Sequence, residues 1–217
     1  MSRKSFLAVF FVILTSFSLA WAQDPEIEQV ESSPPDGLSE KVRNTLGSSA
    51  LRVSVGGSIM GDFWFRKELP LSDGGSAPLG VAFGQIARGT LVGALRLDEN
   101  WSDYKEGPVG GGAYTLRYGI QPEDGEHLGV SLYRDFLMII PGSEDVDPEG
   151  SFSSDDLVDL SKKSSGADHP AVLSLFPLYE EVAEPTVLKN EMDQWMVAVP
   201  LGSLILGLVI EGHGEVE

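Results

Sequence analysis

The sequence predicts a mainly β protein, an antiparallel β-sandwich or a partly open barrel with one or two short helices. Three observations lead to this prediction. Short apolar stretches with period-two alternation recur along the chain, 25 glycines and 13 prolines punctuate it, and the strands do not alternate with helices as in a parallel α/β fold. We expect about eight strands in a single β-rich domain over residues 38–217, a size at which a chain buries a core without disulfides.

Residues 1–22 have the pattern of a cleavable signal peptide. Two basic residues precede an apolar run of 15 residues, 6–20, and the small residues Ala20 and Ala22 fit a signal peptidase site. This run is shorter than the roughly 20 residues of a membrane-spanning helix. We therefore predict cleavage after Ala22, a periplasmic or secreted location, and no stable membrane insertion of the mature chain.

The mature chain is strongly acidic. Loss of the signal peptide, with its two basic residues, takes the formal net charge from −18 to −20. Such a charge repels nucleic-acid phosphates, so we expect no nucleic-acid partner. It leaves open mere solubility, affinity for cations, or a basic envelope or extracellular partner. The chain has no cysteine, which excludes cysteine nucleophiles and lipid attachment at a cysteine.

The first elements of the mature chain are a leader and a short helix. Residues 23–37 are polar, acidic and proline-rich, and we predict a flexible acidic leader there. A helix over residues 38–46 follows, because apolar residues recur at every fourth position and Gly47 provides a stop.

Strands dominate the remainder of the chain. They are predicted at residues 51–55, 60–67, 91–97, 113–118, 132–140, 171–176, 195–199 and 204–211. In the clearest of them Tyr114, Leu116 and Tyr118 share one face. The stretch 132–140 is apolar on both faces, which indicates a central strand.

A second helix is predicted over residues 154–164. Ser153 is a good N-cap, and Asp156 three residues later completes a capping-box pattern. Acidic residues at the start and two lysines at the end match the helix dipole. Gly166 ends the helix.

Several stretches carry a recurring pattern. They are FWFRKELP at 63–70, AYTLRYGIQP at 113–122, DGEHLG at 124–129, YRDF at 133–136, and the stretches 156–161 and 169–175. The pattern resembles an uncharacterised group of secreted bacterial proteins over most of residues 50–210. The Gly-x-Tyr-x-Leu stretch is also similar to secreted β-sandwich domains. The resemblance implies a secreted β-rich fold, and because the group has no assigned activity it implies no catalytic residue.

Aromatic and polar residues near 117–127 form the candidate binding site. This segment joins two strong strands, and such groups bind sugars or peptides at the rim of a sandwich. The ligand-binding candidates are Trp101, Arg117, His127, Tyr133, Arg134 and Asp135. In the alternative interpretation, Tyr118 and Tyr133 belong to the core, and Arg134 and Asp135 form a structural ion pair.

Two functions stay open. The first is a non-catalytic secreted domain that binds a carbohydrate, a peptide or an envelope protein. The second is a metal-dependent hydrolase that uses Glu126, His127 and Asp135. The sequence has neither a His-x-x-x-His spacing nor a Gly-x-Ser-x-Gly motif. We therefore expect the first function and assign no catalytic residue.

The acidic stretch 145–156 resembles an EF-hand-like calcium loop. Counted from Asp145, oxygen ligands fall at positions 1, 3, 5, 7, 9 and 12, and Gly150 falls at position 6, where such a loop turns sharply. The predicted calcium ligands are Asp145, Asp147, Glu149, Ser151, Ser153 and Asp156. The alternative is a solvated acidic loop whose Ser153 and Asp156 only cap the helix.

Overall fold

The computed structural model describes residues 24–72, 77–102, 107–122 and 133–211. Within them the chain is mainly β, which confirms the predicted fold class. Ten strands form one antiparallel sheet: β1 (Glu26–Val30), β2 (Ala50–Val55), β3 (Ser58–Phe65), β4 (Leu91–Leu97), β7 (Gly112–Ile120), β8 (Asp135–Pro141), β9 (Val172–Pro177), β10 (Thr186–Lys189), β11 (Trp195–Leu201) and β12 (Leu204–Glu211). A two-stranded ribbon and two helices complete this part of the chain: β5 (Trp101–Ser102), β6 (Pro108–Val109), α1 (Glu40–Thr45) and α2 (Ser154–Ser165).

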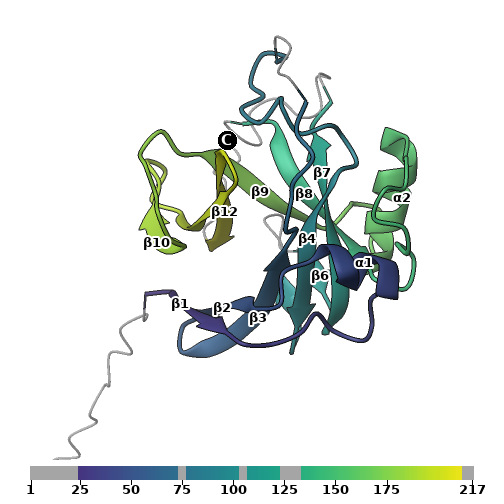
Figure 1. The fold of residues 1–217 in the computed structure, drawn as a ribbon, viewed down its shortest axis with the longest axis horizontal. Coiled ribbons are helices and arrows are strands. Elements are labelled where there is room, and N and C mark those ends of the chain that lie inside the picture. The colour runs from purple at the N-terminus through teal and green to yellow at the C-terminus, as the bar shows by residue number, and fades with distance from the viewer. Residues whose placement is uncertain (1–23, 73–76, 103–106, 123–132, 212–217) are drawn as a thin grey trace, which may run out of the picture.

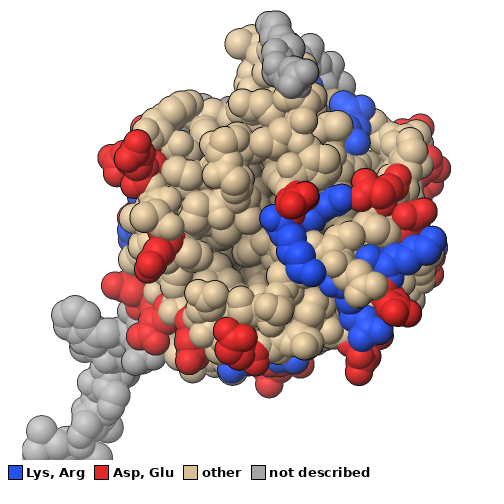
Figure 2. Space-filling view, viewed as in Figure 1, with Lys and Arg blue, Asp and Glu red and all other residues tan. Residues whose placement is uncertain are grey.

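The sheet is curled almost into a closed barrel (Figure 1). Its strand order is β1-β2-β3-β4-β7-β8-β9-β12-β11-β10, and the outermost strands β1 and β10 contact each other. Within the described ranges no backbone pairing joins these two edges, so the architecture is a partly open barrel. Figure 2, in the same view, shows that this face of the molecule is hollowed, with a centre free of charged side chains.

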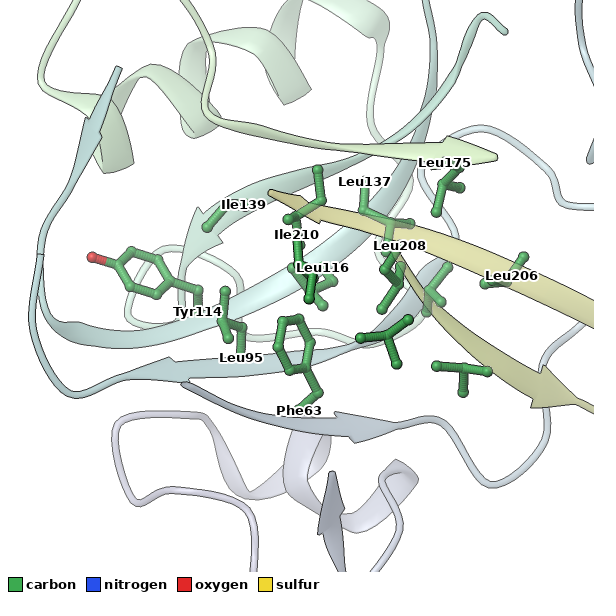
Figure 3. Close-up of a cluster of buried hydrophobic side chains, with 14 of the residues drawn as sticks. Phe63, Leu95, Tyr114, Leu116, Leu137, Ile139, Leu175, Leu206, Leu208 and Ile210 are labelled. Atoms are coloured by element: carbon green, nitrogen blue, oxygen red, sulfur yellow. The ribbon is translucent and has the colours of Figure 1, made fainter. Parts of the chain in front are cut away.

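The core lies inside this barrel because strand alternation directs one row of apolar side chains inward. Figure 3 shows Phe63, Leu95, Leu116, Leu137 and Leu208 meeting there from β3, β4, β7, β8 and β12. Each of these side chains is essentially excluded from solvent. Complete burial of one such side chain contributes about 1.5–3 kcal/mol to stability.

The helices cover the outer face of the sheet. Val42 of α1 lies against Trp64 and Leu91 on the outer side of β3 and β4. Leu157 of α2 lies against Met138 and other apolar residues on the outer side of β8 and β9. Apolar residues therefore occupy both faces of these central strands, as the doubly apolar stretch 132–140 predicts.

The strand β1 differs from the flexible leader predicted for residues 23–37. Ile27 packs against the barrel core, and the register places Glu28 opposite Arg52 of β2. Arg52 in turn donates to Asp62 of β3 at 2.8 Å, and Arg96 of β4 donates to the same carboxylate at 2.7 Å. Alternating charges across four strands thus hold an acidic segment whose composition alone indicates disorder.

Candidate functional site

Arg117, a predicted ligand-binding residue, is completely buried on the outer face of β7. Its Nε donates to Asp145 Oδ2 at 2.6 Å, and its Nη2 donates to Asp145 Oδ1 at 2.7 Å. The guanidinium also donates to the carbonyls of Gly89 and Asp147, each at 2.6 Å. The Phe152 ring stacks on it, with 4.6 Å from Cζ to the ring centroid. These contacts connect β7 to the acidic loop. The guanidinium that was a candidate for ligand binding is bonded to other residues of the protein.

The first three predicted calcium ligands also have protein partners. Asp145 Oδ2 accepts a further hydrogen bond from Thr115 Oγ1 at 2.6 Å. Asp147 Oδ1 accepts from the backbone N–H of Glu149 at 3.2 Å, and the Glu149 carboxylate pairs with Arg66. In the described part of the chain, no group of three or more His, Cys, Asp or Glu residues is arranged to hold a metal ion. Calcium binding stays a prediction, and a calcium ion would have to compete with these protein partners for the carboxylate oxygens.

The capping box predicted at the start of α2 is confirmed. Ser153 Oγ accepts from the backbone N–H of Asp156 at 3.1 Å, and Asp156 Oδ2 accepts from the backbone N–H of Ser153 at 3.0 Å. The helix ends at Gly166, whose φ of 63° is left-handed as a C-cap requires. Ser151, another predicted calcium ligand, is exposed just before the cap. The contacts at Ser153 and Asp156 match the capping-loop alternative.

Replacing the N-cap, Ser153→Ala, is expected to lower the free energy of unfolding by about 1 kcal/mol, because backbone donors of the first turn lose their acceptor. In a chain of this size that corresponds to a melting temperature roughly 2–4 °C lower. Thermal unfolding followed by circular dichroism measures the change. Ser151→Ala is the matched control and should melt as the wild type does. Equal melting temperatures for the two variants would show that the cap contributes nothing.

The same capping box makes stability depend on pH. Hydrogen bonds from the Ser153 side chain and backbone lower the pKa of the Asp156 carboxyl below its ordinary value. A group with a lowered folded-state pKa stabilises the fold above its unfolded pKa, about 3.9, and loses this contribution as the pH falls through the folded-state pKa. The melting difference between wild type and Asp156→Asn should therefore be present at neutral pH and vanish in strong acid.

Asp135 begins β8 and faces the barrel interior with 1 % of its surface exposed. Its Oδ1 accepts from the Tyr118 hydroxyl at 2.5 Å and from the Phe83 N–H at 2.9 Å, and its Oδ2 accepts from the Ala82 N–H at 2.8 Å. Burial, reinforced by the hydrogen bond to Asp135, raises the pKa of Tyr118 far above its usual value. Tyr118 is a core residue, and Asp135 anchors the 82–83 segment to the sheet.

Tyr133 and Arg134 lie beside Asp135 but have different partners. The Tyr133 ring meets Phe176 edge-on, with 4.9 Å between ring centroids. Burial raises the pKa of the Tyr133 hydroxyl, and a hydrogen bond with Tyr179 adds to this shift. Arg134 Nε donates to the carbonyl of Gln121 at 2.9 Å. Arg134 thus joins the two sides of the β7–β8 connection.

The remaining candidates are not brought together with these three. Trp101 lies in the ribbon between β4 and β7, near the start of β7, whereas Asp135 pairs with Ile120 at its end. β7 has nine residues, so at ~3.4 Å per residue its ends are roughly 27 Å apart. Two of the three residues of the hydrolase alternative, Glu126 and His127, fall outside the described residues.

A pocket of about 530 Å³ lies between α2 and the outer face of β7, β8 and β9. Its wall is mainly apolar, and its apolar lining residues include Phe136, Met138, Leu157, Val158, Pro170 and Val172. We call this cavity the α2 pocket. Tyr133 and Asp135 also line it, whereas Arg117 and Trp101 do not. Its volume falls in the range of about 300–1,000 Å³ that is usual for small-molecule sites.

Apart from Asp135, the charged residues of the α2 pocket are ones that sequence reasoning missed. Arg88 and Lys162 line it together with His169 and Asp168. Arg88 is exposed and donates to the hydroxyl of Ser154. Lys162 is half-buried, and its ammonium lies 3.8 Å from an Asp159 oxygen, at the outer limit of an ion pair. The doubly apolar stretch 132–140 signals a covered outer face, but no pattern connects Arg88 with α2.

No family model, no curated protein and no solved structure matches the chain. The resemblance to a group of secreted bacterial proteins therefore stays a prediction. None of the helices in the described ranges is sufficiently long and apolar to cross a membrane.

Proposed function

We propose that the mature chain is an exported, non-catalytic binding domain and that its ligand occupies the α2 pocket. The observation that supports this most strongly is the pocket itself, about 530 Å³ of mainly apolar space between a helix and a sheet. Concave apolar sites with a few polar groups at the edge are the usual form of ligand sites. The signal-peptide pattern of residues 1–22 supports export.

The elements around the α2 pocket are fixed to each other, which favours a preformed site. Ser161 Oγ donates to the carbonyl of Ala171 at 2.8 Å, and Ser164 Oγ donates to the carbonyl of Ile139 at 2.8 Å. These two buried hydroxyls connect α2 to the main chain of β8 and to the residue before β9. Leu157 of the same helix packs against Met138 and Ile140 of β8. A site held in this way loses little conformational entropy when it binds a ligand.

The composition of the wall discriminates among the ligands that the sequence leaves open. Met138, Val158 and Val172 offer aliphatic surface without hydrogen-bonding groups. A carbohydrate would leave its hydroxyls unpaired against such a wall, at a cost for each. An apolar group, whether an alkyl chain or an apolar peptide side chain, gains free energy in proportion to the area it buries.

A neutral polarity-sensitive dye such as Nile red tests this function. The purified mature protein should increase the dye's fluorescence through one saturable site. Ser174→Phe should abolish most of the increase, because Ser174 lines the pocket from β9 and a phenyl ring there occupies the cavity. Ser54→Phe is the matched control, since Ser54 is a half-buried serine on β2, away from the pocket.

Two results would overturn the proposed function. One is a wild-type protein that leaves the dye's fluorescence unchanged. The other is an equal effect of Ser174→Phe and Ser54→Phe, because the dye would then bind elsewhere. Circular dichroism of both variants checks that each retains the β fold.

A further inference from the structure

We propose that the α2 pocket selects a single-chain amphiphile with an anionic head, with the alkyl chain against the apolar wall and the head at Arg88. This inference rests on the proposed function and adds the chemical class of the ligand. It follows from the pocket's wall, from the partners of its cations and from the charge of the whole chain.

Arg88 differs from most arginines of this protein in its partner. Within the described ranges, eight of the twelve Lys and Arg residues form an ion pair with a carboxylate: Arg43, Arg52, Arg66, Arg96, Arg117, Lys162, Lys163 and Lys189. Arg88 donates to the neutral hydroxyl of Ser154 and makes no ion pair with a carboxylate in the described ranges. The chain has 33 acidic and 15 basic residues, so carboxylates are in excess. Because the partner of Arg88 is nevertheless a neutral hydroxyl, its guanidinium is available to bind the anionic group of a ligand in the pocket.

The other charged residues of the pocket are consistent with an anionic head. Lys162 adds a second permanent cation, held only loosely by Asp159 at 3.8 Å. Asp135 also lines the pocket, but its carboxylate is turned toward the barrel interior, where three donors bind it. Asp168 is exposed to water, where solvent weakens its repulsion of an anion. A guanidinium binds a carboxylate or phosphate through two parallel hydrogen bonds.

The apolar wall of the pocket matches an alkyl chain. Met138 and Val172 project from the outer face of the sheet, and Leu157 and Val158 face them from α2. Each methylene group buried against such surface strengthens binding by a similar increment. Shortening the chain by two methylenes should weaken binding about tenfold. A ligand held by its head alone would show no such dependence on chain length.

Titration calorimetry of the mature protein with octanoate, decanoate and 1-decanol, each in monomeric solution, tests the inference. Decanoate should bind with one molecule per chain and about tenfold more tightly than octanoate. It should also bind about tenfold more tightly than 1-decanol, which has the same chain and a neutral head. Decyl phosphate in place of decanoate shows whether a carboxylate or a phosphate head fits better.

Arg88→Gln should weaken decanoate binding about tenfold and leave 1-decanol binding unchanged. Lys41→Gln is the matched control, because Lys41 is an exposed cation on α1 and its loss changes the net charge equally. Equal affinity for decanoate and 1-decanol, or equal losses in the two variants, would overturn the anionic head while Nile red binding still supported the pocket. Failure of the dye and both amphiphiles would overturn the proposed function as well.

Discussion

Replacing Arg117 with methionine is expected to lower the free energy of unfolding by about 3–5 kcal/mol, because it leaves a buried carboxylate without its counter-charge. Arg117 and Asp145 both have 0 % of their side-chain surface exposed, so water cannot take the place of the lost guanidinium. In a chain of this size the melting temperature should fall by roughly 6–20 °C. Chemical denaturation followed by circular dichroism measures the free energy directly.

A double variant separates the charge from the packing. Arg117→Met combined with Asp145→Leu removes both charges together, and exchange of a buried pair for apolar side chains is often neutral or stabilising. We therefore expect the double variant to recover most of the lost stability. Lys163→Gln breaks an exposed pair with Glu144 and should cost under about 1 kcal/mol. A loss of that small size in Arg117→Met itself would show that the buried pair is not what holds the acidic loop.

Asp135→Ala is expected to lower the free energy of unfolding by about 3–5 kcal/mol, because it removes the acceptor of three hydrogen bonds at once, two of them buried and one part-buried. The N–H groups of Ala82 and Phe83 and the hydroxyl of Tyr118 would lose their partner. Each buried donor left unsatisfied costs about 1–3 kcal/mol. Denaturant unfolding measures the loss.

Two variants act as controls for Asp135→Ala. Tyr118→Phe removes only one of the three donors and should cost about 1 kcal/mol. Asp159→Ala removes an exposed carboxylate from α2 and should change the free energy of unfolding by no more than about 0.5 kcal/mol. An Asp135→Ala variant as stable as Asp159→Ala would mean that Asp135 is not a structural anchor. That result would favour the alternative in which Asp135 takes part in a hydrolase site.

Elements with a strong local signal could be predicted from the sequence. Alternation places Tyr114, Leu116 and Tyr118 on the inner face of β7, as the structure shows. The capping box at Ser153 and the glycine stop at Gly166 define α2 within a residue or so. In both cases the information lies within a few residues of chain, where periodicity and capping act.

Elements that depend on distant partners could not be predicted. β1 is acidic and flanked by proline, and it orders because Arg52 faces Glu28 from the next strand. The four-residue β10 is too short for alternation to mark it, and it forms by pairing with β11. Composition describes what a segment can bury alone, whereas a sheet edge is stabilised by its neighbour.

The candidate site illustrates the same limit. A run of carboxylates favours a calcium loop, but only the fold shows that Asp145 meets Arg117, 28 residues earlier in the chain. Tyr133 and Asp135 were predicted as site residues and do line the α2 pocket. Arg88 reaches that pocket through the packing of α2 on the sheet, for which the sequence has no local pattern.

A crystal structure of the mature protein with decanoate tests the central claim most directly. We predict one alkyl chain between α2 and the outer face of β8 and β9, in contact with Met138 and Leu157, with its carboxylate within hydrogen-bonding distance of Arg88. Decanoate bound in another cavity, or an α2 pocket closed by the protein's own side chains, would contradict it.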